Sequence, residues 1–127
     1  MTDGERFIAQ LPRKTRFYDR NERRAYEMTR AVAARLIDVP DLVGKALSYM
    51  ERHMKDPSQP RQYAIWRDLL GREVEDIVRL LLEDSPKGAF LRETQPVFCV
   101  FTLDERQRIL SRARANDAQI LVGDARP

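Results

Sequence analysis

Apolar residues recur along most of the chain at every third or fourth position, which is the spacing of an amphipathic helix. The clearest example follows Asp19 and Glu22, whose spacing is that of a capping box at a helix start. Several arginines lie on the opposite side of this helix, which should end before Pro40. Its apolar stripe consists of Ala25, Met28, Thr29, Val32, Ala33 and Leu36.

Capping residues, prolines and a glycine mark the boundaries of the other helices. Asp38, Ser58 and Ser85 are each followed within two residues by a proline, and this order is typical of a helix N-terminus. Thr102 begins a second capping box, and Gly71 suits a helix C-terminus because glycine tolerates a positive φ. The further helices predicted from these signals span about residues 3–11, 39–54, 60–70, 72–83, 86–92 and 103–115.

One stretch departs from helical spacing. Residues 96–101 read Pro-Val-Phe-Cys-Val-Phe, which resembles a strand, but the chain offers no second strand to pair with it. We interpret it as an extended linker that crosses the core. The predicted fold class is therefore all-α, an irregular bundle of five to seven helices. Residues 1–115 should form a single domain, and the weakly patterned residues 116–127 a frayed tail. The expected core contains Met28, Val32, Leu36, Leu47, Met50, Trp66, Leu69, Ile77, Leu81, Phe98, Phe101 and Leu110.

Composition is consistent with one globular domain. Of the 127 residues, 43% are hydrophobic and 34% charged, which argues against both a disordered chain and a membrane protein. The longest apolar runs are far shorter than the roughly 20 residues of a membrane span. The single cysteine cannot form an internal disulfide, and Pro12 ends the first apolar residues too early for a secretory signal. We expect a cytoplasmic protein, and its oligomeric state does not follow from the sequence.

Residues that carry chemistry are few and scattered. The chain has one histidine, His53, and one cysteine, Cys99, whereas a zinc site needs several convergent ligands. Cys99 lies between Phe98 and Val100, an apolar setting that should raise the pKa of its thiol and make it unreactive. The five glycines are isolated and form no phosphate-binding loop. We therefore predict no catalytic residues, no metal and no cofactor.

Positive charge is concentrated near the N-terminus. Residues 1–35 contain nine Lys and Arg against five Asp and Glu, whereas residues 36–95 contain nine against eleven. Segment 13–26 also carries aromatic residues, so it suits an acidic surface of another protein or, alternatively, nucleic acid. A third interpretation is a solvated charged face, with Phe17 and Tyr18 anchoring the segment to the core. The candidate partner-binding residues are Arg13, Arg16, Phe17, Tyr18, Arg20, Arg23 and Arg24.

A family resemblance covers the second half of the chain. Its motifs are Trp-Arg-Asp-Leu-Leu at 66–70, Leu-Arg-Glu-Thr-Gln-Pro-Val-Phe at 91–98 and Asp-Glu-Arg at 104–106. With these, residues 63–110 resemble short uncharacterised bacterial helical proteins of antitoxin or defence-associated type. The chain departs from that pattern where Val97 separates the proline from the phenylalanine. The resemblance implies a helical protein that covers the surface of another protein.

The roles of two residues in this region follow from physical arguments that do not depend on the resemblance. Trp66 should anchor the core, because it falls on the apolar side of its helix. Arg92, near a helix end, should bind the last carbonyls of that helix or, if it is buried, several carbonyl or carboxylate partners. The favoured function is a non-catalytic protein-binding partner, with an antitoxin or inhibitor role as its most specific form. The alternative is a nucleic-acid-binding accessory protein that uses segment 13–26.

Overall fold

The computed structural model describes residues 1–53, 59–96 and 101–124, with side chains up to residue 115. These residues form seven helices and no strand, so the all-α prediction is confirmed. No described helix is both long and apolar enough to span a membrane. The helices are α1 (Asp3–Ala9), α2 (Arg20–Asp38), α3 (Asp41–His53), α4 (Pro60–Leu70), α5 (Val74–Leu81), α6 (Pro86–Thr94) and α7 (Leu103–Asp124).

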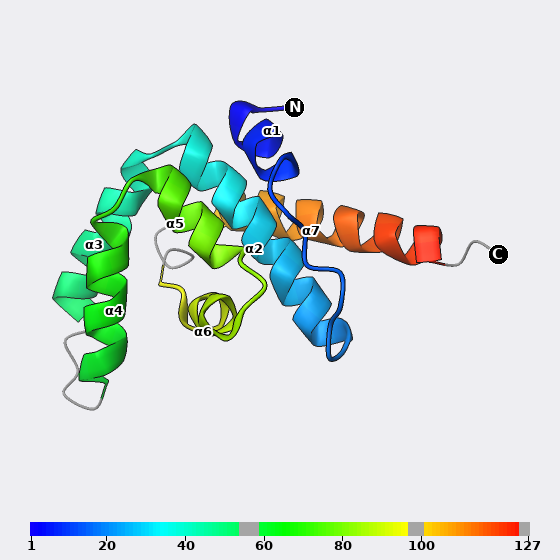
Figure 1. Cartoon of the computed structure of the whole chain (residues 1–127). Coiled ribbons are helices and arrows are strands. Elements are labelled where there is room, and N and C mark those ends of the chain that lie inside the picture. Colours follow the sequence, from blue (N-terminus) through cyan, green and yellow to red (C-terminus); the bar gives the residue numbers. More distant parts are fainter. Residues whose placement is uncertain (54–58, 97–100, 125–127) are drawn as a thin grey trace.

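Helix α2 is the centre of the bundle. It packs against α1 and α7 along one side and against α3, α5 and α6 along the other, while α3 and α4 form a pair at one end of the molecule (Figure 1). α7 crosses behind α2 and extends beyond the body toward the C-terminus (Figure 1). This arrangement follows from the apolar stripe of α2, in which Val32, Ala33 and Leu36 are buried.

Most of the expected core is buried. Trp66 is fully buried, and its indole Nε1 donates a hydrogen bond to the Thr94 hydroxyl at 2.8 Å, which satisfies its only polar group. Met28 and Leu47 are only partly buried, and Phe98 lies outside the described residues. The remaining expected core residues of the described chain are buried, apart from Leu110: Val32, Leu36, Met50, Leu69, Ile77, Leu81 and Phe101.

The prediction for Leu110 is wrong. Its side chain is 37% exposed, and the core position on α7 belongs to Ile109, which is 3% exposed. Adjacent residues on a helix point about 100° apart, so only one of the two can face α2. Ala113, one turn beyond Ile109, is buried on the same side. Leu103 lies at the start of α7 and is 70% exposed.

The helix starts inferred from capping residues are confirmed in three places. The Asp19 carboxylate accepts a hydrogen bond from the backbone N–H of Glu22 at 2.9 Å, which caps α2. Ser85 caps α6 in the same manner, through the N–H of Gly88 at 3.0 Å. Thr102 accepts from the N–H of Glu105 at 3.2 Å and begins α7. These caps supply acceptors for backbone donors that a helix leaves unpaired at its first turn.

Asp38 does not cap α3, contrary to the sequence prediction. It is the last residue of α2, and its carboxylate accepts a hydrogen bond from the backbone N–H of Gly4 at 2.8 Å. Gly4 packs so closely on α2 that a β-carbon there would collide with the carbonyl oxygen of Ala34. The Asp38 carboxylate therefore binds a residue that is distant in the sequence and not the first turn of α3. This hydrogen bond fixes α1 on α2.

Other boundary predictions have mixed outcomes. Gly71 does follow α4, but its φ of −85° is one that any residue adopts. Ser58 lies outside the described residues, and Gln59 precedes α4 without a side-chain cap. Pro96 and Phe101 are both buried, whereas residues 97–100 of the expected core-crossing linker, Cys99 among them, lie outside the described part of the chain.

Helix α7 is longer than the apolar pattern predicts. Its backbone is helical to Asp124, past residue 116, where a frayed tail is expected from the sequence. Residues 108–122 include three Ala, three Arg and two Leu, which are strong helix formers, and contain no proline or glycine. Local propensity thus continues the helix without an apolar stripe. The division of the chain at residue 116 stays a prediction.

Candidate partner-binding surface

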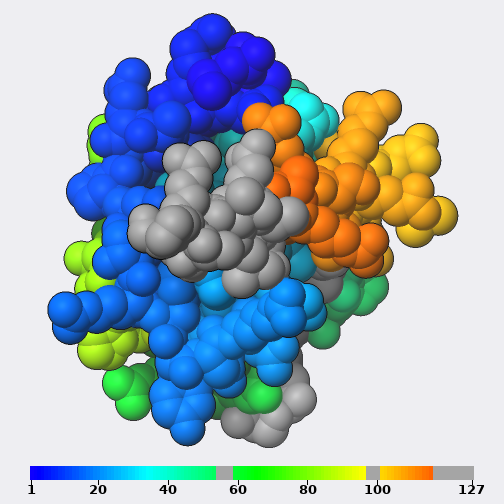
Figure 2. All heavy atoms as spheres, turned by 90° about the vertical axis from the view of Figure 1, so that its right-hand side faces the viewer, coloured from blue at the N-terminus to red at the C-terminus, as the bar shows by residue number. Residues whose placement is uncertain are grey.

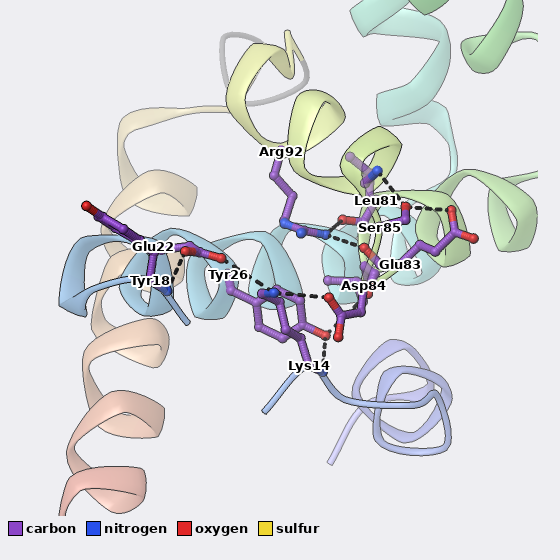
Figure 3. Close-up of polar contacts among 11 residues, drawn as sticks. Lys14, Tyr18, Glu22, Tyr26, Leu81, Glu83, Asp84, Ser85 and Arg92 are labelled. Carbon is purple, nitrogen blue, oxygen red and sulfur yellow. Dashed lines mark hydrogen bonds and ion pairs between the residues drawn. The ribbon is translucent and has the colours of Figure 1, made fainter. Parts of the chain in front are cut away.

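Residues 12–19 join α1 to α2 as an extended segment, which we call the strap. The hydroxyl of Tyr26, a fully buried residue of α2, holds it in place (Figure 3). This hydroxyl accepts a hydrogen bond from the backbone N–H of Lys14 at 3.1 Å and donates one to the carbonyl of Leu82 at 3.3 Å. One side chain of α2 thus connects the strap to the end of α5.

Lys14 provides a second attachment. Its ammonium group lies 3.0 Å from the carboxylate of Asp84 and 3.5 Å from that of Glu22, which links the strap to the α5–α6 connection and to α2 (Figure 3). The hydrogen bond to Asp84 raises the pKa of Lys14. The ammonium also lies 5.5 Å from the centre of the Phe17 ring. The position of the strap is therefore fixed by charge as well as by backbone hydrogen bonds.

Arg92 completes the corner between α5 and α6. Its guanidinium donates hydrogen bonds to the carbonyls of Leu81 and Glu83, both at 2.9 Å, and lies 5.2 Å from the centre of the Tyr26 ring (Figure 3). Desolvation by burial lowers the pKa of this guanidinium. Arg92 is only partly buried, and the carbonyls that it binds belong to the last residue of α5 and to the α5–α6 connection, not to the end of α6.

Two of the sequence-predicted site residues face inward from the strap. Phe17 is half-buried and packs on Tyr26 with a distance of 5.5 Å between ring centres, as the anchoring interpretation expects. Arg13 forms an ion pair with Glu27, whose side chain is fully buried, and the Nε of Arg30 lies 4.0 Å from the same carboxylate. Phe17 and Arg13 therefore hold the structure together.

Three other residues face outward and form what we call the Tyr18 face: Arg16, Tyr18 and Arg20. The side chain of Tyr18 is 94% exposed, so it does not anchor the strap. Its backbone N–H donates a 2.7 Å hydrogen bond to Glu22, which fixes the main chain beneath the exposed ring. Arg16 and Arg20 are exposed and have no ion pair among the described residues.

Arg23 and Arg24 follow on the first turns of α2. Arg23 is half-buried and Arg24 exposed, and both take part in interactions within the protein. Of the seven predicted residues, the structure therefore places three on one outward surface and engages the other four internally. The sequence could not separate these groups, because both contain arginines and aromatic residues in alternation.

A second feature was not predicted from the sequence. A cleft of about 610 Å³ lies between α1, α2 and α7. Figure 2 shows the face of the molecule on which these helices and the strap lie. Basic residues of α2, of α7 and of the strap line the cleft, but they are far apart in the sequence. The only signal was the density of arginines in α2 and α7, and their convergence requires knowledge of the packing. The arginines that line it are Arg13, Arg30, Arg35, Arg108 and Arg112.

Within residues 1–53, 59–96 and 101–115, no group of three or more His, Cys, Asp or Glu side chains could hold a metal ion. His53 is exposed at the end of α3, with its ring centre 4.8 Å from that of Tyr49.

Comparisons with known proteins do not identify a family for this chain. No protein-family model matches the chain, and neither the curated proteins nor the solved structures give a match.

Proposed function

We propose that this chain is a non-catalytic, cytoplasmic protein-binding partner, and that its Tyr18 face binds an acidic surface of another protein. The observation that supports this most directly is the setting of Tyr18. Its ring is 94% exposed although the residue before it in the chain, Phe17, is packed against the core. A large aromatic side chain left in water between two arginines is unfavourable for the isolated chain and useful in a complex.

The rigidity of the strap strengthens this argument. Tyr26 holds Lys14 and Phe17, which precede Tyr18 in the strap, so little conformational entropy is lost when a partner binds. Tyrosine and arginine are also the residue types that contribute most to binding energy in protein interfaces. An exposed aromatic ring with an exposed arginine two residues away on either side in the sequence therefore suits a partner surface that combines an apolar patch with carboxylates.

A protein partner is favoured over nucleic acid by the charge pattern of this surface. Only Arg16 and Arg20 lack internal ion pairs in the described part of the segment, and Asp19 lies between them in the sequence. Two cations next to a carboxylate would release few counterions from a phosphate backbone, which limits affinity at physiological salt. The other basic groups of the segment already contact groups within the protein.

An antitoxin or inhibitor role is the most specific form of this proposal. It rests on the resemblance of residues 63–110 to proteins of that type. In such a role, the Tyr18 face would cover a functional surface of the partner, and the chain itself would need no catalytic group.

The test uses a partner captured from a nuclease-treated extract of the native host and then purified for titration. Tyr18→Ala should weaken its binding at least about tenfold, as loss of an interface aromatic does. The double variant Arg16→Glu, Arg20→Glu should slow association more than it speeds dissociation. The matched control is Arg67→Glu, a charge reversal at an exposed position on α4, which should leave binding unchanged.

Two results would count against the proposal. One is a partner whose affinity is the same for the wild type, for Tyr18→Ala and for the double variant. The other is tight nucleic-acid binding, with a Kd below about 1 µM at about 0.15 M salt, that the double variant abolishes. That outcome would make the nucleic-acid alternative the correct one.

A further inference from the structure

The cleft between α1, α2 and α7 combines an apolar lining with an unusual number of arginines. Its volume of about 610 Å³ lies within the range of small-molecule sites in proteins. The apolar part of its lining comes from all three helices, through Ile8, Ala31, Ala34 and Ile109. The two alanines of α2 leave space that a larger side chain would fill.

The ion pairs around the cleft account for most of its charges. Arg35 binds Glu105 at 2.9 Å, and Arg112 binds Glu5. The carboxylate of Asp38 is occupied by the backbone N–H of Gly4. The two ion pairs join α7 to α2 and to α1, so they fix the spacing of the helices that form the walls of the cleft.

Two arginines retain donors without acceptors. The Nη1 atom of Arg30 is buried and has no hydrogen-bond partner, although the Nε of the same side chain lies 4.0 Å from Glu27. Arg108 is exposed and has no ion pair among the described residues. A buried guanidinium donor without an acceptor is unfavourable, and such groups usually mark the place of a missing partner.

We propose that this cleft binds a small organic carboxylate that has an apolar body. The carboxylate would pair with the exposed guanidinium of Arg108, whose planar donors match the two oxygens of a carboxylate. The Nη1 of Arg30 is buried, so this side chain would have to turn toward the cleft to donate to the same carboxylate. The apolar body would lie against Ala31, which is partly buried, and against the edges of Ile8 and Ile109, which are each 3% exposed. An anion without an apolar part would leave this surface in water, and a neutral apolar molecule would leave the arginine donors unpaired.

This site is separate from the Tyr18 face. None of the three residues of that face lines the cleft. The two proposals can therefore fail independently.

The probes are octanoate, its neutral analogue octanol, and inorganic phosphate, each titrated into the full chain and followed by NMR. Octanoate should bind more tightly than either control and should shift the methyl signals of Ile8, Ala31, Ala34 and Ile109. Arg108→Gln should weaken octanoate binding about tenfold, which is the effect of losing one hydrogen bond to a charged group. Arg67→Gln, the same change at an exposed position on α4, should leave the affinity unaltered.

A second variant tests the cavity without changing any charge. Ala31→Phe places a ring in the cleft and should abolish octanoate binding, while the phosphate affinity stays low. Because Arg108 is exposed, the Arg108→Gln protein should fold even if Ala31→Phe does not. The proposal is overturned if octanol or phosphate binds as tightly as octanoate, if the shifted methyl groups lie elsewhere, or if Arg108→Gln binds octanoate like the wild type.

Discussion

Two regions that pack against α2 contain arginines, and they differ in how far the polar groups of these arginines are paired. In the α5–α6 corner, Arg92 donates to two carbonyls at 2.9 Å and lies over the ring of Tyr26. In the α1–α2–α7 cleft, Arg30 has a buried Nη1 without a partner. Arg108 lines this cleft of about 610 Å³ and has no ion pair in the described chain.

This difference distinguishes a structural arginine from one that is available to a ligand. In the corner, Arg92 is packed against its neighbours and donates to carbonyls at and just after the end of α5, so it acts as a cap of that helix. The cleft contains ion pairs that join its walls, but it also has unoccupied volume and guanidinium donors without acceptors. Residue type and charge are the same in both places. The two regions differ in whether the surrounding helices pack against the guanidinium group.

The largest expected effect compares these two arginines directly. Arg92→Ala should lower the free energy of unfolding by about 2–4 kcal/mol, because two carbonyls at the end of α5 lose their donor. Arg108→Ala should change it by no more than about 0.5 kcal/mol, as is usual for an exposed residue. Urea denaturation followed by the fluorescence of Trp66 measures both. Equal losses in the two variants would remove the distinction between the regions.

A smaller effect is expected at the hydroxyl that connects the strap to this corner. Tyr26→Phe keeps the buried ring but removes the acceptor for the Lys14 N–H and the donor to Leu82. The cost should be about 1–2 kcal/mol, because both groups lose a hydrogen bond in a partly buried place. Hydrogen exchange at the Lys14 amide should become faster than in the wild type, whereas exchange in α3 should not. Unchanged exchange at Lys14 would show that the hydroxyl does not hold the strap.

Helix positions could be predicted from the sequence because their determinants are local. The capping residues Asp19, Ser85 and Thr102 act on N–H groups three residues away, so a short window contains both partners. The prediction for Asp38 was wrong because its actual partner, Gly4, is 34 residues away. A pattern of single residues does not reveal that α1 returns to the end of α2.

The candidate sites were harder to predict for the same reason. Phe17 and Tyr18 are adjacent aromatic residues, and only the position of Tyr26 decides which of them is buried. The cleft requires three helices to meet, so its arginines are indistinguishable in the sequence from those of a solvated helix face. Ile109 and Leu110 show the same limit on a smaller scale, since the helix pattern does not say which apolar neighbour faces α2.

The bracing of the cleft gives a pH-dependent prediction. The hydrogen bond from Arg35 holds the pKa of the Glu105 carboxyl below its ordinary value. A carboxyl with a depressed folded-state pKa adds stability above its unfolded pKa, and this contribution is lost as the pH falls through the folded value. Glu105→Gln should therefore cost about 0.5–1 kcal/mol at neutral pH, a modest figure because Arg35 is partly exposed to solvent.

Thermal melts of the wild type and of Glu105→Gln across pH would measure this contribution. The two melting temperatures should converge as the pH falls through the lowered pKa of Glu105, because the wild-type carboxyl then becomes protonated as well. The control is Glu93→Gln, which removes an exposed carboxylate on α6 and should give no such convergence. A constant difference between Glu105→Gln and the wild type at every pH would mean that the ion pair does not brace the cleft.

The smallest expected effect on stability belongs to the Tyr18 face and tests whether the strap has an internal and an external side. Tyr18→Ala should alter the free energy of unfolding by no more than about 0.5 kcal/mol, because the ring is 94% exposed and makes no ring contact with the described residues. Phe17→Ala should cost at least about 1 kcal/mol, because a partly buried aromatic ring is removed from Tyr26. If Tyr18→Ala is instead as destabilising as Phe17→Ala in urea titrations, Tyr18 contributes to folding, and its exposure no longer argues for a binding surface. A stable Tyr18→Ala protein that has lost its partner is the result that the proposed function requires, because only an interface residue combines a large effect on binding with almost none on folding.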